Sequence, residues 1–307
     1  SPKLLIKSSA GLFLLKRRAP GRDENERVTA AHAVQNYLAG RQFPVPRLLP
    51  TRDEHDTALR VGGRVYELFE FIPGSRYDGS LSATSEAGHT LALFHKIISG
   101  FHGAPPTHHP HGYHALPSVP DALDHIPRDS RLARPDLAEV CADLRELYQD
   151  AARRSDKLGL REWPAQIVHG DWHPGNTLYR GQRLVAVIDF DGVRPEQRAL
   201  DIANGALQFS ITMEGQDIAN WPDYLDETRF KRFCRGYDAV EGCILSTSEI
   251  QAIPWLMIEA LVVEAALPIA ATGAFAGLDG GAFLVMVRRK AHWLRDHAAR
   301  LSNLLTA

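Results

Sequence analysis

The sequence predicts an α+β fold with two lobes, a small and mostly antiparallel β lobe over residues 1–72 and a larger, mainly helical lobe over residues 73–307. Two observations support this division. Short apolar runs separated by turn residues fill the first lobe, whereas apolar residues at helical spacing dominate after the Pro73-Gly74 break. A chain of 307 residues is also long enough to bury a sizeable core.

The first lobe contains two candidate hairpins and one helix. They are a hairpin of Leu4–Lys7 with Gly11–Arg17, a helix over Asp23–Ala39, and a hairpin of Ala58–Val61 with Arg64–Ile72. Gly62-Gly63 suits the turn of the second hairpin, because glycine adopts positive φ readily. Pro44 and Pro46 follow the helix and stop its continuation.

The second lobe shows helical periodicity over most of its length, most clearly in its first segment. The predicted helices cover Thr84–Ile98, Pro135–Leu158, Leu200–Phe209, Arg229–Val240, Thr247–Ala271 and Gly281–Leu305.

Three short strand segments interrupt these helices. They are Ile167–Val168, Thr177–Tyr179 and Leu184–Phe190. The last is an apolar run with β-branched residues, typical of a buried strand, and Gly181 marks the turn before it. The hairpin that follows from this pattern brings Asp189 back beside Asn176.

The polar residues of this hairpin suit phosphoryl transfer. An aspartate and an asparagine oxygen that converge at a strand end are hard ligands for a divalent cation such as Mg²⁺. Asp171 lies five residues before Asn176 on the same loop and can face whatever the metal holds. One acid for a proton and two ligands for a metal that bridges phosphates are the minimal parts of that reaction.

The motif at these positions resembles a known family. H-G-D-x-H-x-x-N followed by I-D-F is similar to the signature of the aminoglycoside phosphotransferase and choline kinase family, to which the type II homoserine kinases belong. These small-molecule kinases have a protein-kinase-like fold, whose own motifs are H-R-D-L-x-x-x-x-N and D-F-G. The matching residues are His169, Gly170, Asp171, His173, Asn176, Ile188, Asp189 and Phe190.

The resemblance implies roles for the loop residues. Asp171 would be the catalytic base, and Asn176 and Asp189 the magnesium ligands for bound ATP. His169 would be a structural support of the loop, and His173 either a second support or a phosphate contact.

Two further aspartates follow the motif. Asp191 either helps the metal through water or is a solvated turn residue. The resemblance gives Asp201 the role of bracing the catalytic loop by hydrogen bonds. A helix N-cap is the other interpretation, and the two are compatible.

In the first lobe, the resemblance implies that Lys16 pairs with the nucleotide phosphates, although Arg17 and Arg18 make the register ambiguous. The family holds this lysine with a glutamate on the next helix, but the family spacing falls on Ala31 or His32. Glu24 and Glu26 would substitute only if the helix were shifted.

The phosphate-binding loop departs from the family pattern, whereas the interlobe connector follows it. No G-x-G-x-x-G loop precedes Lys16, so either the first strand is missing or the turn at Ser8-Ser9-Ala10 covers the phosphates. Glu70 and Ile72 lie where the interlobe connector is expected. The Glu70 carbonyl and the Ile72 amide would then bind the adenine edge.

Several residues outside the motif leave alternatives open. Histidines 102, 108, 109, 111 and 114 crowd one loop, but their spacing matches no standard zinc site. In relatives, the C-terminal helices form the acceptor pocket. There Glu259 and Glu264 either receive a substrate amine, lie on a solvated face or tie helices together. Trp255 belongs to the same helices, and Trp293 either stacks on a substrate or packs in the core.

The composition excludes several classes of protein. A net charge of −2 gives no support for nucleic-acid binding. Three cysteines without metal-ligand spacing indicate a reducing compartment, hence the cytoplasm. The longest apolar stretch, Ile253–Ala271, is interrupted by charge and proline, which argues against a membrane span. Nothing in the sequence indicates an oligomeric state.

These observations predict an ATP-dependent O-phosphotransferase that acts on the hydroxyl of a small metabolite. One alternative is a catalytically weak or inactive nucleotide-binding module on a kinase fold. Another is a metal-dependent hydrolase built on His169, Asp171, His173 and Asp189.

Overall fold

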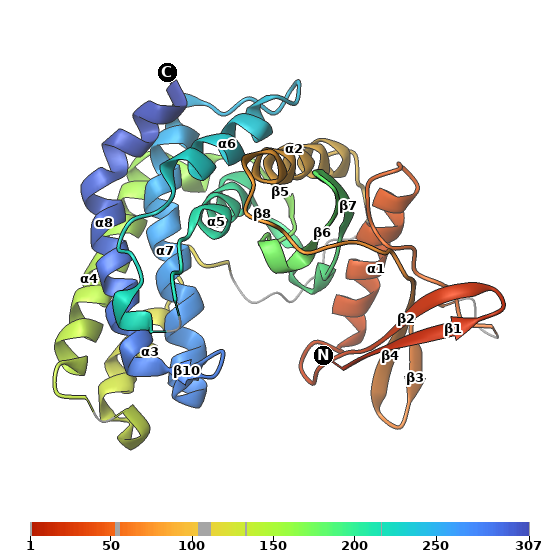
Figure 1. Cartoon of the computed structure of the whole chain (residues 1–307), viewed down its shortest axis with the longest axis horizontal. Coiled ribbons are helices and arrows are strands. Elements are labelled where there is room, and N and C mark those ends of the chain that lie inside the picture. Colours follow the sequence, from red (N-terminus) through yellow and green to blue (C-terminus); the bar gives the residue numbers. More distant parts are fainter. Residues whose placement is uncertain (1, 53–55, 104–111, 133, 216, 307) are drawn as a thin grey trace.

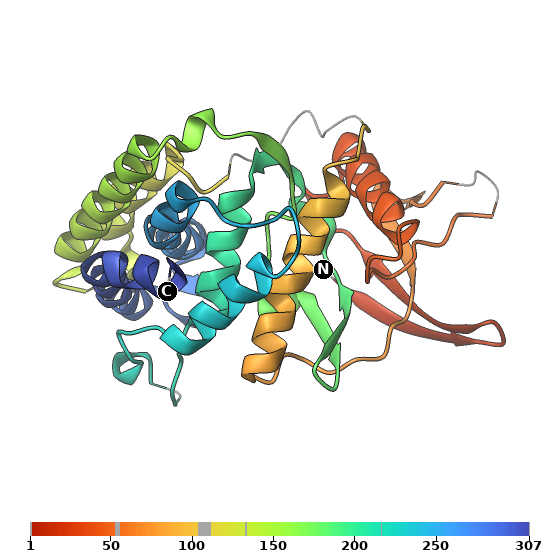
Figure 2. The same cartoon turned by 90° about the horizontal axis from the view of Figure 1, so that it is seen from above.

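We describe a computed structural model of the chain, which covers residues 2–52, 56–103, 112–132, 134–215 and 217–306. A small lobe of strands and one helix lies to the right in Figure 1, and a larger lobe of packed helices lies to the left. The helix α2 (Leu81–Ile98) runs along the top between them, as the view from above in Figure 2 also shows.

The small lobe is built on an antiparallel sheet in the order β1-β2-β4-β3. Its elements are β1 (Lys3–Ser8), β2 (Gly11–Arg17), β3 (Leu59–Val61), β4 (Arg64–Glu70) and the helix α1 (Asn25–Ala39). Both predicted hairpins are therefore present. In the central pair, Lys16 of β2 lies directly opposite Glu67 of β4, a register that places the two side chains on the same face.

The larger lobe contains the predicted helices together with shorter elements that the sequence pattern did not indicate. Its long helices are α2, α4 (Leu137–Lys157), α5 (Arg198–Ser210), α6 (Glu227–Asp238), α7 (Thr247–Thr272) and α8 (Gly280–Thr306). The elements not predicted are α3 (Ser118–His125), β8 (Arg194–Gln197), β9 (Ala274–Phe275), β10 (Leu278–Asp279) and the 3-10 turns η1 (Ile126–Arg128), η2 (Ser130–Leu132), η3 (Leu160–Glu162) and η6 (Ile218–Asn220).

Two glycines let α2 and α6 approach very closely. A Cβ atom on Gly88 would lie 1.9 Å from the Phe233 carbonyl oxygen, and one on Gly236 would lie 2.1 Å from the Ser85 carbonyl oxygen. Any larger residue at these positions would force the helices apart. This contact fixes α2, which in turn supports the central hairpin.

The central hairpin consists of β6 (Thr177–Arg180) and β7 (Arg183–Val187), with Gly181 at its turn. A second pair joins β5 (Ala165–Val168) to β8, so that the catalytic motif leaves one pair and enters the other. The prediction of a strand up to Phe190 was wrong. The strand ends at Val187 because Asp189 adopts a left-handed backbone, and a 3-10 turn, η5 (Phe190–Gly192), follows.

Backbone hydrogen bonds connect the two lobes. The Val187 amide donates to the Pro44 carbonyl at 2.8 Å, and Ser75 and Tyr179 form an isolated bridge. Only the first of these contacts joins segments on either side of residue 72, whereas the bridge fixes the connector at Ser75 to the hairpin, so the central hairpin is anchored to both parts of the chain. The division of the chain into 1–72 and 73–307 stays a prediction.

The helix α7 passes, by length and composition, as a candidate membrane span, with a mean hydropathy of 1.7 in its most apolar window. In the structure, 72% of that window is buried inside the protein against the neighbouring helices. Its apolar character is thus explained by its place in the core of the helical lobe.

Candidate active site

The catalytic loop runs from β5 to β6 and ends in the 3-10 turn η4 (Pro174–Asn176). The Asn176 Nδ2 atom donates to the Asp171 backbone carbonyl and to Asp171 Oδ2, each at 2.9 Å. Because both amide hydrogens are engaged by Asp171, the Asn176 Oδ1 atom is left to face another ligand. The Asp171 side chain is 43% exposed, so a substrate can reach it.

Asp189 lies beside this loop, as the hairpin predicted. Thr177 pairs with Val187, and the Ile188 amide donates to the Asn176 carbonyl at 3.0 Å. Asp189 has φ 67° and ψ 67°, a left-handed conformation that few non-glycine residues adopt. Backbone strain of this kind often accompanies functional sites, and here it turns the carboxylate out of the strand toward a pocket.

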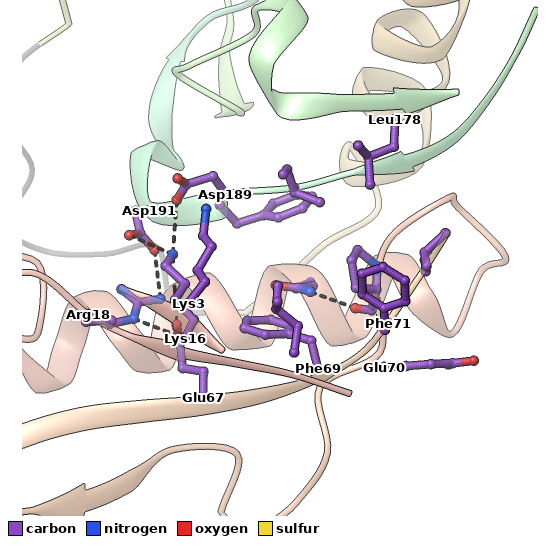
Figure 3. Close-up of a pocket in the computed structure, with 16 residues that line it drawn as sticks. Lys3, Lys16, Arg18, Glu67, Phe69, Glu70, Phe71, Leu178, Asp189 and Asp191 are labelled. Carbon is purple, nitrogen blue, oxygen red and sulfur yellow. Dashed lines mark hydrogen bonds and ion pairs between the residues drawn. The ribbon is translucent and has the colours of Figure 1, made fainter. Parts of the chain in front are cut away.

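That pocket lies between the lobes and has an apolar part and a charged part (Figure 3). Its apolar walls come from residues of both lobes, including Leu14, Phe69, Leu178 and Ile188. The charged end is formed by Lys3, Lys16, Arg18, Glu67, Asp189 and Asp191. An apolar slot beside a charged end is the combination that a flat base linked to phosphates requires.

Lys16 is the residue that joins the two lobes at the charged end. Its side chain is buried, and its Nζ atom lies 3.1 Å from Asp189 Oδ1, 3.1 Å from Asp191 Oδ2 and 3.9 Å from Glu67 Oε2. Arg17 points outward and is exposed. Arg17 is therefore excluded, whereas Lys16 and Arg18 both line the pocket, and the pairing of Lys16 with the nucleotide phosphates stays a prediction.

The structure contradicts one of the two alternatives for Asp191, the solvated turn residue, and its assistance to the metal through water stays a prediction. It is only 7% exposed, and besides Lys16 it contacts Arg18 Nη2 at 2.9 Å through Oδ1. It is thus a buried ion-pair partner of two cations from β2 and the segment after it, and the solvated-turn alternative is wrong.

The charges around the site keep both catalytic-loop and hairpin carboxyls ionised. Burial opposes the charged form of Asp189, but Lys16, together with Lys3 and Arg22, holds its pKa below the usual value. For Asp171 burial also acts against ionisation. The neighbouring His173 and His169 and the amide of Asn176 outweigh it and lower the pKa.

Asp201 anchors the backbone of the catalytic loop by hydrogen bonds. Its carboxylate accepts the His169 amide at 2.6 Å and the Gly170 amide at 2.8 Å, and His95 lies 3.3 Å away. The N-cap alternative is wrong, because α5 begins after Gln197 and Asp201 lies within its first turn. Full burial opposes ionisation of Asp201, but the hydrogen bond and charge of His95, together with the charge of His169 and the Gly170 amide, lower its pKa.

The two histidines of the motif differ in environment. His169 is fully buried among Phe94, Trp172 and Phe190, and burial lowers its pKa. His173 is partly exposed. Its Nδ1 accepts the Gly175 amide at 3.0 Å, while its Nε2 lies 3.5 Å from Asp171 Oδ1. The hydrolase alternative gains no support, since the described part of the chain holds no group of three or more His, Cys, Asp or Glu residues placed to bind a metal.

The sequence analysis did not identify the acidic partner of Lys16 in the small lobe. The helix position carries His32, and the acid comes instead from Glu67 on the neighbouring strand. Glu24 and Glu26 are exposed at the start of α1. The helix is therefore not shifted so as to place either residue where the family has its glutamate. Alternation along β2 and β4 was the available signal, because it places Lys16, Arg18 and Glu67 on one face.

The remaining expectations for the nucleotide site have mixed outcomes. Glu70 and Ile72 line the pocket, as the connector interpretation requires, and their backbone contacts with adenine stay a prediction. The turn at Ser8-Ser9-Ala10 is not a lid. It lies at the far end of the β1–β2 hairpin from Lys16, which lines the pocket.

On the C-terminal helices, Glu259 and Glu264 have separate roles. Glu259 is buried and accepts His114 Nδ1 at 3.0 Å and the Ala115 amide at 2.9 Å, so it ties a loop to α7. Glu264 is half-buried and accepts a hydrogen bond from Gln208 of α5. Burial, with the nearby charge of Asp171, raises the pKa of Glu264 to about 7.

Trp255 and Trp293 do not line the pocket. The Trp255 ring lies 4.4 Å from the Arg154 guanidinium, and Trp293 stacks on His297 at 4.5 Å. Within the loop, His108, His109 and His111 fall outside the described residues, and His102 is exposed.

The donor atoms present fit Mg²⁺. Asn176 and Asp189 would supply two oxygen ligands, and Mg²⁺ is commonly held by one or two protein groups plus substrate phosphates. The cluster of cations at the same end of the pocket suits a polyphosphate.

Comparison with known proteins agrees with this geometry. The model of the phosphotransferase enzyme family (APH) matches residues 2–243. The chain belongs to the phosphotransferase enzyme family. The match covers the small lobe, the catalytic loop and the hairpin, so the resemblance inferred from the motif is confirmed.

Individual relatives are more distant. A homoserine kinase of Zymomonas mobilis is 27% identical over 186 residues, which are 56% of this chain and 50% of that protein. The chain's matches span 50% to 62% of the curated relatives' own lengths.

Solved structures show the same fold. The microcompartment-associated aminopropanol kinase has a TM-score of 0.71 at 15% identity, covering 98% of this chain and 90% of that one. The amicoumacin kinase hAmiN in complex with AMP-PNP, Ca²⁺ and Ami has a TM-score of 0.65 at 15% identity, covering 94% and 84%. The expected α+β, protein-kinase-like fold is confirmed.

Proposed function

We propose that this protein is an ATP-dependent O-phosphotransferase that transfers the γ-phosphoryl group to a hydroxyl of a small metabolite. The observation that carries the proposal is the Lys16–Asp189 ion pair in an interlobe pocket, on a strand end whose Ile188 amide is hydrogen-bonded to the Asn176 carbonyl of the Asn176–Asp171 pair. The family membership and the kinases among its relatives support it.

In this proposal each residue has one task. Lys16 binds and orients the phosphates as a point charge, and the backbone of Glu70 and Ile72 holds the adenine. Asn176 and Asp189 hold Mg²⁺, which neutralises charge on the phosphates when bound. A fold relative solved with AMP-PNP and Ca²⁺ is consistent with a nucleotide and a divalent cation here.

Asp171 is the base of the proposed reaction. Its lowered pKa keeps it ionised at neutral pH, and its exposed carboxylate can accept the proton of an acceptor hydroxyl. Asn176 and His173 restrict its orientation, while Asp201 fixes the backbone before it. Most of the rate enhancement would come from positioning and charge neutralisation.

The proposed acceptor is a metabolite, and the proposed compartment is the cytoplasm. Two curated relatives are named homoserine kinases, and a fold relative is named an aminopropanol kinase, which points to small amino alcohols. The three free cysteines are buried, in keeping with a reducing compartment.

The test is ADP release with Mg²⁺ and ATP across a panel of amino alcohols, choline and sugars. Asp171→Asn should lower kcat by at least about 10²-fold, because it removes the base, while Mg-nucleotide affinity stays within about twofold. Asp121→Asn, an exposed acid on α3, serves as the control.

Full activity of Asp171→Asn would contradict the assigned role. Magnesium-dependent nucleotide binding by the native protein without turnover of any acceptor would indicate the non-catalytic module instead.

A further inference from the structure

The small lobe contains a buried network in which helix α1 contributes a histidine. His32 is 4% exposed, its Nε2 atom lies 2.5 Å from Glu67 Oε1, and its Nδ1 atom lies 2.6 Å from Thr57 Oγ1. The helix therefore contacts an acid on the sheet and does not itself supply one to Lys16.

The acid of this network is on β4, the strand that pairs with the strand of Lys16. Glu67 is 1% exposed and directly opposite Lys16 in the ladder. Its Oε1 atom receives both His32 and the Arg18 Nε atom, the latter at 2.7 Å. Two donors on one oxygen hold the carboxylate in a single orientation.

The other oxygen of this carboxylate faces Lys16 without a hydrogen bond. Glu67 Oε2 is buried, has no hydrogen-bond partner among the described residues, and lies 3.9 Å from Lys16 Nζ. A buried carboxylate oxygen left without a donor is unfavourable, because it loses its hydrogen bonds to water and gains none from the protein. Lys16 is the nearby cation that can supply the donor, and Figure 3 shows it between Glu67 on one side and Asp189 and Asp191 on the other.

We propose that Glu67, oriented by His32 and Arg18, is the acid that positions Lys16 for the nucleotide phosphates, in place of the family's helix glutamate. This inference rests on the proposed function. Glu67 and His32 are positioning residues, because they act through Lys16 and do not contact the reacting atoms.

The location of the acid on the sheet determines what sets the distance between the acid and the Lys16 side chain. Lys16 and Glu67 sit on adjacent hydrogen-bonded strands, so their separation is set by the ladder. His32 reaches Lys16 through its contact with Glu67. Loss of His32 should therefore weaken the lysine's function less than loss of Glu67.

The test compares the binding of Mg-AMP-PNP and of adenosine, by calorimetry, to the native protein and to Glu67→Gln, Glu67→Asp and His32→Ala. Glu67→Gln should weaken Mg-AMP-PNP binding at least about tenfold and leave adenosine binding within about twofold, because only the phosphates need Lys16. His32→Ala should weaken Mg-AMP-PNP binding about threefold. A purely structural role would weaken both ligands together.

A double variant and a control complete the design. If His32 acts through Glu67, His32→Ala combined with Glu67→Gln should bind Mg-AMP-PNP no more weakly than Glu67→Gln alone. Glu24→Gln, an exposed glutamate that precedes α1, should match the native protein for both ligands.

The inference is overturned if Glu67→Gln keeps Mg-AMP-PNP affinity within twofold of native, or loses adenosine equally. Should Glu67→Gln not fold, Glu67→Asp and His32→Ala decide by the same criterion. A native protein that binds no Mg-AMP-PNP would instead overturn the proposed function itself, which separates the two failures.

Discussion

Single carboxylates of this protein have very different environments, and those environments set their charges. Asp201 is buried but receives two backbone amides, so it stays ionised. Glu264 is half-buried with a neutral amide as its partner and with Asp171 nearby, so its proton is held more tightly. A carboxyl group thus anchors backbone amides as an anion at Asp201 and retains its proton more readily at Glu264.

Glu264 should make stability depend on pH near neutrality. Its pKa is raised from 4.5 to about 7, so the folded protein binds its proton more tightly than the unfolded chain does. The stabilisation is complete below pH 4.5 and is lost as pH rises through 7.

Replacing Glu264 by Gln removes this dependence. Glu264→Gln should equal the native protein in unfolding free energy near pH 4.5 and exceed it at pH 8 by on the order of 1 kcal/mol, a value reduced because the carboxyl is partly solvated. Urea unfolding across this range measures the difference. A difference that does not vary with pH would contradict the assignment.

At the scale of elements, the contact between α2 and α6 depends on the absence of side chains. Gly88→Ala should gain about 1 kcal/mol of helix propensity, but its Cβ would overlap the Phe233 carbonyl oxygen. Overpacking typically costs about 1–3 kcal/mol or more, and a backbone atom cannot rotate away. The net expectation is a loss of about 2 kcal/mol in unfolding free energy.

Gly40→Ala is the matched control for this prediction. Gly40 ends α1 with φ −65°, and a Cβ there would lie 3.5 Å from the nearest atom. Chemical unfolding should show it within about 0.5 kcal/mol of native. Equal effects of the two substitutions would mean that helix contact is not the cause.

The elements with strong periodicity could be predicted from the sequence, and the short ones could not. The prediction of Thr247–Ala271 agrees with α7 to within one residue at its C-terminal end. The agreement is close because Ser246 and Glu249 form a capping box and Gly273 ends the helix. By contrast, β8 contains Pro195 and only four residues, and it exists because β5 offers it a partner. Pairing between distant segments leaves no local pattern.

The site divides in the same way. Residues of the motif lie within 21 positions of one another, and their spacing was sufficient to find them. The contacts of Lys16 with Asp191 and of Arg18 with Glu67 join residues 175 and 49 positions apart. The first contact depends on how the lobes pack and the second on which strands pair, and neither is encoded in a local period of a single sequence.

For the whole molecule, the most important contact between the lobes is the one that Asp191 makes with Lys16 and Arg18. Asp191→Asn should lower the unfolding free energy by about 3 kcal/mol, because it removes a negative charge that compensates two buried cations. High salt should change this effect little, since the pairs are shielded from solvent. Urea unfolding at low and high salt provides the measurement.

Amide hydrogen exchange gives an independent check of the same contact. In Asp191→Asn, exchange should accelerate in β1 and β2 more than in α7 and α8, because the small lobe loses its attachment. Asp121→Asn, exposed on α3, should alter neither stability nor exchange. Uniform acceleration throughout the chain would show that Asp191 does not act between the lobes.

The short distance between Lys16 and Asp189 has a consequence for ligand order under the proposed function. An ammonium group and a divalent cation compete for the same carboxylate oxygen, so free Mg²⁺ should bind weakly alone. Phosphates that attract the ammonium release the carboxylate, and a cation that occupies it releases the ammonium. By thermodynamic reciprocity, each ligand then raises the affinity of the other by the same factor.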